Sequence, residues 1–317
     1  MAHQQRVAIL SLPDDLHALM IQDQLLSKDI DCHIVETSRL YKGGLCWTSH
    51  GEAGHTIPTS TGELLDVQEI NLVWYRRINY PQEIPDTGRE PIQTEIVDNE
   101  YKATLFGLLA TGFTGKWIND PFASVGAENK LIQLMAAKRA GLRIPRTLVT
   151  HDPARVRKFC EALDYEVVVK TVKGSARRPL YAIKATEELV AAEDSIRFAP
   201  AIYQELVPGT AHIRAHCFGD ATHAFEIESA SLDWRGNLNV PIKPVALDDR
   251  TVAGLQEVLR ILGLRMGIFD LKRVGTEEYA WLEVNPQGQF LFLEGLTGER
   301  LSVAFTNFLV DELKPAR

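Results

Sequence analysis

The chain has 317 residues, of which 45% are hydrophobic and 24% are charged, and its 34 basic and 42 acidic side chains give a formal net charge of −8. This is the composition of an ordinary soluble protein, large enough for about two domains, and it excludes fibrous and mini-protein classes. The acidic balance, without a long basic block, also argues against nucleic acid as a partner, because phosphate binding depends on clustered Lys and Arg.

Cysteine spacing and apolar runs predict the compartment. The four cysteines, at positions 32, 46, 160 and 217, form no C-x-x-C pair, which favours reduced thiols. The apolar run near the N-terminus is too short for a signal peptide, and no segment approaches about 18 uninterrupted apolar residues. We therefore expect a cytoplasmic protein with no membrane partner.

The first part of the chain predicts an open α/β layer. A strand at 7–10, a helix at 14–27 and a strand through Ile34 and Val35 begin this layer. No glycine lies in the first strand-to-helix turn, which argues against a nicotinamide-binding Rossmann domain, because that turn needs glycines beside the pyrophosphate.

A further strand at 71–76 and a long helix complete the layer. The apolar stripe of this helix consists of Val97, Tyr101, Leu105 and Leu108. The next clear break is Asp120–Pro121, because a residue before proline is pushed out of the α region. We therefore expect a domain boundary after residue 120.

Beyond the boundary the pattern changes to α+β. A helix from about 127 to 140 is predicted to carry Leu131, Leu134 and Met135 inward. Strand-like runs with antiparallel neighbours are expected at 146–150, 166–172, 181–185, 201–206, 211–218 and 221–229. A helix near 252–262, two strands at 267–274 and 279–285, and a C-terminal helix end the chain.

The sharpest chemical signal is the predicted hairpin GIFDLKRV-GTEE-YAWLEVNP. If its turn is tight, with Gly275 facing Glu278, then Asp270 falls directly opposite Glu283, and Asn285 follows on the same face. Facing carboxylates repel unless a cation lies between them, and these three oxygen donors suit a hard divalent ion such as Mg²⁺. A solvated acidic face, neutralised by a nearby lysine such as Lys272, explains the spacing equally well.

Several weaker signals precede the hairpin. Lys130 lies in the first turn of a helix, where a cation is mildly unfavourable and a bound phosphate would offset that effect. Lys170 ends the apolar strand EVVVK. Residues 173–178, KGSARR, form a candidate anion loop, and YQELVPG at 203–209 suits the presentation of backbone groups to a flat ring. Each signal taken alone is more often a solvated surface feature.

Together and in this order, these features resemble the ATP-grasp ligases. The ordered set consists of Lys130, VVVK ending in Lys170, YQELV at 203–207, HIR at 212–214, GIFDLK with Asp270, and LEVNP at 282–286. VWYRR at 73–77, DWR at 233–235 and LEVNPQGQFLFLE at 282–294 are similar to the microviridin-type ligases, the graspetide macrocyclases. These enzymes join side chains of a ribosomal precursor peptide through esters or amides.

The resemblance implies a fold of mixed α/β and α+β character. It implies an N-terminal open α/β pre-ATP-grasp domain at 1–120, a central lobe with lid and hinge at 121–210, and a C-terminal lobe with the metal site at 211–317. It also implies a homodimer and, as partner, a precursor peptide with a leader segment and an acidic core.

The resemblance further implies the roles of site residues, with ATP and Mg²⁺ as cofactors. Nucleotide contacts would come from Lys130, Lys170, Gln204, Glu205, Leu206, Val207 and His212, where His212 replaces the acidic residue that often binds ribose. The metal ligands would be Asp270, Glu283 and Asn285. Arg214 and Arg235 would stabilise the transferring phosphoryl group, since guanidinium matches phosphate bidentately.

Three functions are compatible with this set. The first is ATP-dependent macrocyclisation, in which Asp or Glu side chains become acyl phosphates that Ser or Thr hydroxyls or Lys amines attack. The second is a ligase that adds an amino acid to a peptide or small acid, and the third is an inactive module that binds a leader peptide. Arg76 and Arg77 are either strand-end residues or contacts to an acidic substrate.

Overall fold

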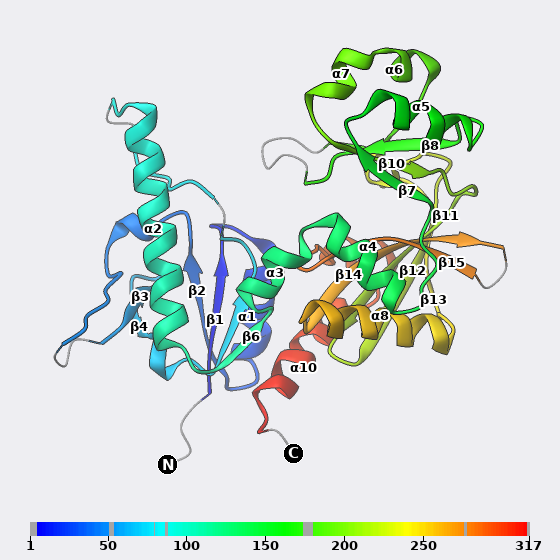
Figure 1. Ribbon diagram of the computed structural model, residues 1–317. Coiled ribbons are helices and arrows are strands. Elements are labelled where there is room, and N and C mark those ends of the chain that lie inside the picture. Colours follow the sequence, from blue (N-terminus) through cyan, green and yellow to red (C-terminus); the bar gives the residue numbers. More distant parts are fainter. Residues whose placement is uncertain are drawn as a thin grey trace. The chain divides into compact units, whose positions relative to one another are not determined.

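The computed structural model describes residues 5–50, 54–78, 80–85, 88–173, 180–275 and 278–315. The chain folds into two compact units, which Figure 1 shows: unit 1 is Met1–Pro121 with Gln289–Arg317, and unit 2 is Phe122–Gly288. This division lies one residue from the expected boundary at 120, whereas residues 289–317, expected in the last lobe, group with unit 1. None of the helices in the described ranges combines the length and apolar character needed to cross a bilayer.

Unit 1 is built on a four-stranded parallel sheet, as the apolar strand runs predict. Its strand order is β2 (Asp31–Glu36), β1 (Arg6–Ser11), β5 (Leu72–Tyr75), β6 (Lys116–Ile118). Helix α1 (Leu16–Leu26) connects β1 to β2, and α2 (Pro91–Gly112) connects β5 to β6. Shorter elements are η1 (Leu40–Lys42), β3 (Thr56–Pro58), β4 (Leu64–Asp66) and η2 (Val67–Glu69).

Alternate side chains of β5 explain why the C-terminal segment belongs to unit 1. Tyr75 packs in one core with Leu105 and Leu109 of α2. Trp74 points to the opposite face, where its ring lies 4.6 Å from that of Phe305 in α10 (Leu301–Leu313). The sheet therefore needs α10 to cover its second face.

The first layer of unit 2 is an antiparallel sheet with helices. Its strand order is β7 (Thr147–Thr150), β10 (Ala201–Glu205), β8 (Val167–Lys170), β9 (Ile183–Lys184). The helices, drawn in green beside this sheet in Figure 1, are α5 (Pro153–Glu161), α6 (Glu187–Ala191) and α7 (Glu193–Phe198). They bury Val156, Cys160, Val190 and Ile196 with Tyr203 of β10.

The second layer of unit 2 is a five-stranded antiparallel sheet. Its order is β13 (Ile242–Val245), β12 (Ala221–Glu228), β11 (Ala211–Phe218), β14 (Met266–Val274), β15 (Glu278–Asn285). Helices α4 (Lys130–Arg139) and α8 (Asp249–Leu262) share its core, and α3 (Pro121–Ala127) and η3 (Trp234–Gly236) are the other described elements of unit 2. Helix α9 (Leu291–Thr297) lies in the C-terminal segment and belongs to unit 1.

The predicted inward face of α4 is partly wrong. Leu131 and Met135 are 40% and 56% exposed, whereas Leu134 is buried as expected. The buried face instead includes Ala136 and Ala137, because small side chains let α4 approach α8 closely. Gln133 is also buried and donates hydrogen bonds to two backbone carbonyls, at 2.6 and 2.8 Å, so its polar group is satisfied.

The β14–β15 hairpin has the predicted pairing at its acidic end. Asp270 pairs with Glu283, as expected, but Val274 rather than Gly275 pairs with Glu278. The register shifts between Asp270 and Leu271, where β15 contains one extra residue. The prediction therefore misplaced the turn by one residue. The extra residue of the bulge compensates for this error, so Asp270 and Glu283 still face each other.

Candidate functional site

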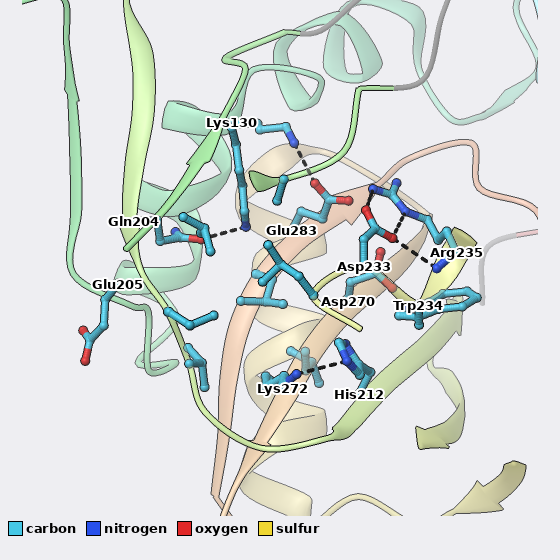
Figure 2. Close-up of a pocket in the computed structure, with 18 of the residues that line it drawn as sticks. Lys130, Gln204, Glu205, His212, Asp233, Trp234, Arg235, Asp270, Lys272 and Glu283 are labelled. Atoms are coloured by element: carbon cyan, nitrogen blue, oxygen red, sulfur yellow. Dashed lines mark hydrogen bonds and ion pairs between the residues drawn. The ribbon is translucent and has the colours of Figure 1, made fainter. Parts of the chain in front are cut away.

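Side chains from both layers of unit 2 line one pocket, which Figure 2 shows. Ten of the twelve predicted site residues are among its lining: Lys130, Lys170, Gln204, Glu205, Leu206, Val207, His212, Arg235, Asp270 and Glu283. The other two, Arg214 and Asn285, are not among the lining residues. The anion loop expected at 173–178 falls, from Gly174 onward, outside the described residues.

The two facing carboxylates are bound by different cations. Arg214 Nη1 donates to both oxygens of Asp270, at 2.8 and 3.0 Å, and Lys130 Nζ lies 2.8 Å from Glu283 Oε2. Burial raises the pKa of Asp270, and the neighbouring Glu283 charge adds to this effect. Burial acts in the same direction on Glu283, but the Lys130, Lys170 and Arg235 charges outweigh it and hold its pKa at about 2.

The donor set at this pair fits a divalent cation in part. Asp270 and Glu283 share one face of the sheet. The raised pKa of Asp270 means that its ionised form is disfavoured, and a bound cation would stabilise that form. Asn285 is exposed, and its Oδ1 accepts a hydrogen bond from the Gln287 N–H at 2.9 Å. Among the described residues, no three His, Cys, Asp or Glu side chains are clustered as a preformed metal site.

Lys170 faces the same acids from β8. Its Nζ donates to Gln204 Oε1 at 2.8 Å, and the Gln204 amide donates in turn to Thr147 Oγ1 at 3.0 Å. Burial lowers the pKa of Lys170 to about 8, and the positive charges of Lys130 and Arg235 contribute to this shift. Two ammonium groups and a guanidinium therefore lie in this pocket beside the carboxylates of Asp233, Asp270 and Glu283. This mixture of charges suits a polyanionic ligand that is bound together with a divalent cation.

Residues 205–207 leave β10 and line the pocket. The carboxylate of Glu205 is bound by the backbone N–H of Arg146 at 3.0 Å and by its Nε at 3.2 Å. Figure 2 shows this side chain pointing away from the other labelled residues, so its carboxylate is engaged by Arg146 rather than by them.

His212 and Lys272 form a buried pair across β11 and β14. Lys272 Nζ lies 3.0 Å from His212 Nε2, and the two residues are partners in the strand register. Burial, with the Lys272 charge second, lowers the pKa of His212 to about 4, so the ring is neutral and its Nε2 accepts from the ammonium. Lys272 therefore does not neutralise the acids, and its contact with His212 could not be predicted without the pairing of β11 with β14.

Asp233 is a pocket residue for which the sequence predicted no role. It accepts hydrogen bonds from Arg235 Nε at 2.8 Å and Nη2 at 2.5 Å, which is a bidentate pair. The Arg235 guanidinium lies over the ring of Tyr181, 5.9 Å from its centroid. The DWR motif contained the signal, because an acid two residues before an arginine in a turn can bind its side chain.

Arg76 and Arg77 lie in unit 1 and share one carboxylate. Arg76 is 1% exposed, and its Nε and Nη2 donate to Asp15 at 2.7 and 3.1 Å. Arg77 Nε lies 3.2 Å from the same carboxylate, while its Nη1 donates to the Tyr80 hydroxyl at 3.0 Å. Arg76 is therefore a buried structural residue at the end of the strand, whereas the Arg77 guanidinium is partly exposed to solvent.

Solved structures share this fold over nearly the whole chain. Macrocyclase MdnC of Microcystis aeruginosa MRC, bound to precursor peptide MdnA, matches with a TM-score of 0.86 and 25% identity over 97% of this chain and 100% of its own. Macrocyclase MdnB of the same organism matches with a TM-score of 0.79 and 25% identity, over 96% and 99%. A RiPP-associated ATP-grasp ligase of Chryseobacterium gregarium, in complex with ADP and a leader and core peptide, gives 0.86 and 22%, over 98% of both chains.

Sequence comparison gives a shorter match. No family model matches the chain. The alpha-aminoadipate–LysW ligase LysX of Sulfurisphaera tokodaii is 31% identical over 74 residues, which are 23% of this chain and 26% of that protein. The match thus spans about a quarter of the curated relative, whereas the structural matches span nearly all of theirs.

Proposed function

Because the chain is an ATP-grasp ligase with the fold of the RiPP macrocyclases, we propose that it uses ATP to close rings within a ribosomally made precursor peptide. The observation that carries the proposal is the pocket of unit 2, where Lys130, Lys170 and Arg235 surround the facing carboxylates of Asp270 and Glu283. This arrangement fits a nucleoside triphosphate together with its metal ion.

The proposed reaction activates a carboxylate, which is by itself a poor electrophile. An oxygen of an Asp or Glu side chain of the peptide attacks the γ-phosphorus of ATP, so that ADP leaves and an acyl phosphate forms. A Ser or Thr hydroxyl, or a Lys amine, then attacks the acyl carbon. Phosphate leaves, the nucleophile loses its proton, and an ω-ester or ω-amide closes the ring. Catalysis of this kind consists mainly of positioning and charge stabilisation.

The described contacts support a role for each part of the pocket. Lys130 and Lys170 would bind the phosphates, and Arg235, held by Asp233, would stabilise the transferring group. The backbone at 205–207 would bind adenine, with Gln204 holding Lys170 in place. His212 and Lys272 would together contact the ribose hydroxyls, with the Lys272 ammonium as donor.

Asp270 and Glu283 would hold Mg²⁺, with Asn285 as a third ligand after its oxygen leaves the Gln287 N–H. Mg²⁺ held there would neutralise negative charge on the phosphates of ATP. Arg214 contacts Asp270 and does not line the pocket, so it would act by positioning that carboxylate. A homodimer, a cytoplasmic location and a peptide partner with a leader and an acidic core belong to the same proposal.

Intact-mass analysis tests the function directly. The protein is incubated with Mg-ATP and the short acidic peptide encoded beside its gene, and each ring formed removes one water from the peptide. Glu283→Gln is expected to abolish this loss, whereas Glu278→Gln, on an exposed part of the same strand, should retain it. An unchanged peptide without ADP formation in the wild type would leave only the inactive leader-binding module.

A second candidate is an amino-acid ligase, which the local match to LysX favours. It would share the ATP pocket and differ only in the acceptor. A gain in peptide mass when free amino acids are supplied would identify this activity, because ligation adds a molecule whereas ring closure removes water.

A further inference from the structure

Unit 1 contains a second cavity, separate from the ATP pocket in its residues and its chemistry. Its volume is about 140 Å³. Leu10 of β1 and Leu105 and Leu109 of α2 line it and are almost fully buried. Phe106 and Lys102, also on α2, line it as well, and Phe106 is 37% exposed, so the cavity has an outer rim on this helix.

The topology of the sheet places this cavity where open α/β sheets bind ligands. The chain leaves β1 toward β2 on one side and leaves β5 toward β6 on the other, so the strand order reverses between β1 and β5. Such a reversal opens a crevice at the carboxyl ends of the two strands. Leu10, the next-to-last residue of β1, and Tyr75, the last residue of β5, both line the cavity.

The size and the floor of the cavity fit one aromatic ring. An apolar cavity of about 150 Å³ lined by aliphatic side chains binds benzene. The hydroxyl of Thr37, a polar group of the lining, already donates to the Arg77 carbonyl at 2.6 Å. The floor therefore offers mainly apolar contacts.

The rim adds positive charge to this apolar floor. Lys102 is half-buried, and its ammonium forms no hydrogen bond or ion pair within the described part of the chain. Arg77, which is bonded through its carbonyl to Thr37, shares the single carboxylate of Asp15 with Arg76. Among the lining residues, the ammonium of Lys102 supplies the positive charge. The matching ligand has an aromatic ring beside a carboxylate.

We propose that this cavity docks an aromatic side chain of the acidic precursor peptide, with a neighbouring Asp or Glu of the peptide bound by Lys102. The identity of the peptide rests on the proposed function, since a chain that supplies Asp and Glu side chains for activation has the negative charge that the rim requires. The cavity thus serves as an anchor that holds the substrate to unit 1.

The test begins with a probe that needs no substrate peptide. Phenylacetate has the ring and the carboxylate, and its binding to the full chain is followed by saturation-transfer NMR. Binding is expected for the wild type, for Ile96→Ala on the same helix and for the exposed Lys28→Met. Phe106→Ala should weaken binding about tenfold and Lys102→Met about fivefold, as for loss of one apolar anchor or one charge contact. No saturation transfer in the wild type would overturn the proposal.

The second arm asks whether the peptide is the occupant. A peptide that the wild type modifies should displace phenylacetate, and Phe106→Ala and Lys102→Met should raise its KM with little change in kcat and no change in ATP binding. A modified peptide that leaves phenylacetate bound would overturn the docking while the proposed function stands. Phenylacetate binding without any peptide modification would point to a small aromatic acid as the ligand and against the proposed function. A change from dimer to monomer in Phe106→Ala, measured by light scattering, would identify a second copy as the occupant instead.

Discussion

Asp270 and Glu283 face each other across β14 and β15, yet each carboxylate is bound by its own cation, Arg214 for Asp270 and Lys130 for Glu283. The two cations come from different elements, β11 and α4, so the acidic pair links a strand and a helix far apart in the chain. In the proposed function Lys130 also binds phosphate, and this double role would make the Glu283 charge a determinant of nucleotide binding.

Glu283→Gln should separate two roles of this carboxylate, which are its ion pair with Lys130 and its proposed contact with Mg²⁺. Removal of its negative charge beside Lys130 and Lys170 should strengthen ATP binding without Mg²⁺, while Mg²⁺-dependent turnover falls by about 100-fold or more. Isothermal titration with and without Mg²⁺ measures the first effect, and ADP release measures the second. Glu278→Gln is the matched control, and equal losses of binding in both conditions would contradict the assignment.

Arg214→Met should destabilise unit 2, because it leaves the buried Asp270 carboxylate without its bidentate partner. Breaking a buried pair in this way costs about 3 kcal/mol of the free energy of unfolding. Arg143→Met removes an exposed pair with Glu278 and should cost less than about 1 kcal/mol. Urea unfolding of both variants checks the difference, and similar costs would show that the Asp270 pair is solvated.

Nucleotide affinity should fall as the pH rises through about 8. An anionic ligand binds the protonated form of Lys170, whose pKa burial lowers to about 8, so the ammonium is complete below that value and is lost above it. The decline should approach tenfold per pH unit. Titration with a non-hydrolysable ATP analogue between about pH 6.5 and 9.5 measures it. Lys170→Arg, which remains charged, should bind with a flat profile, and a decline in that variant would assign the titration to another group.

Stability should also fall on acidification, because of His212. Its pKa is lowered from 6.5 to about 4 in the folded chain, so the unfolded chain takes up a proton first. The destabilisation begins near pH 6.5, grows as the pH falls and is complete below about 4, where it reaches up to about 3 kcal/mol. His212→Gln keeps an acceptor for Lys272 and should remove this component, as urea unfolding at pH 7 and pH 5 would reveal. An identical pH dependence in wild type and variant would show that the ring is solvated.

Asp15 should be required for the stability of unit 1. The Arg76 guanidinium is almost fully buried, so Asp15→Asn leaves an uncompensated charge that costs about 3 to 5 kcal/mol. The double variant Asp15→Asn with Arg76→Leu should recover a large part of this loss, because the buried guanidinium is then removed and Arg77, which also binds Asp15, is partly exposed. Thermal or urea unfolding of the wild type, Asp15→Asn, Arg76→Leu and the double variant completes the cycle. Additive losses would show that the two side chains are not coupled.

The sequence pattern was sufficient for most of the local elements. Apolar periodicity located the parallel strands and the helices. Hairpin counting placed Asp270 opposite Glu283, but only because the one-residue error at the turn is cancelled by the bulge. The bulge could not be predicted, because one extra residue in β15 leaves no mark in the alternation of side chains around Leu282. The inward face of α4 also depended on a neighbour, since only the approach of α8 makes Ala136 and Ala137 the buried side.

The partners of charged residues were the least predictable part of the site. Arg214 meets Asp270 and His212 meets Lys272 because β11 pairs with β14, about 50 residues further along the chain. Local sequence carries no signal for that pairing. Asp233 is the exception, because its partner Arg235 is two residues away and the DWR motif already contains both.

Because residues 289–317 fold as part of unit 1, they determine which truncated forms of the protein can fold. Unit 2 is a single stretch from Phe122 to Gly288, whereas unit 1 is made from both ends of the chain. A fragment that stops at Pro121 would lose Phe305 and expose Trp74 to water, so truncation there should yield an insoluble product. Unit 1 could be isolated only by joining residue 121 to residue 289 through a linker, and a protease that nicks the chain near 121 should leave its two pieces held together by the aromatic contacts of α10.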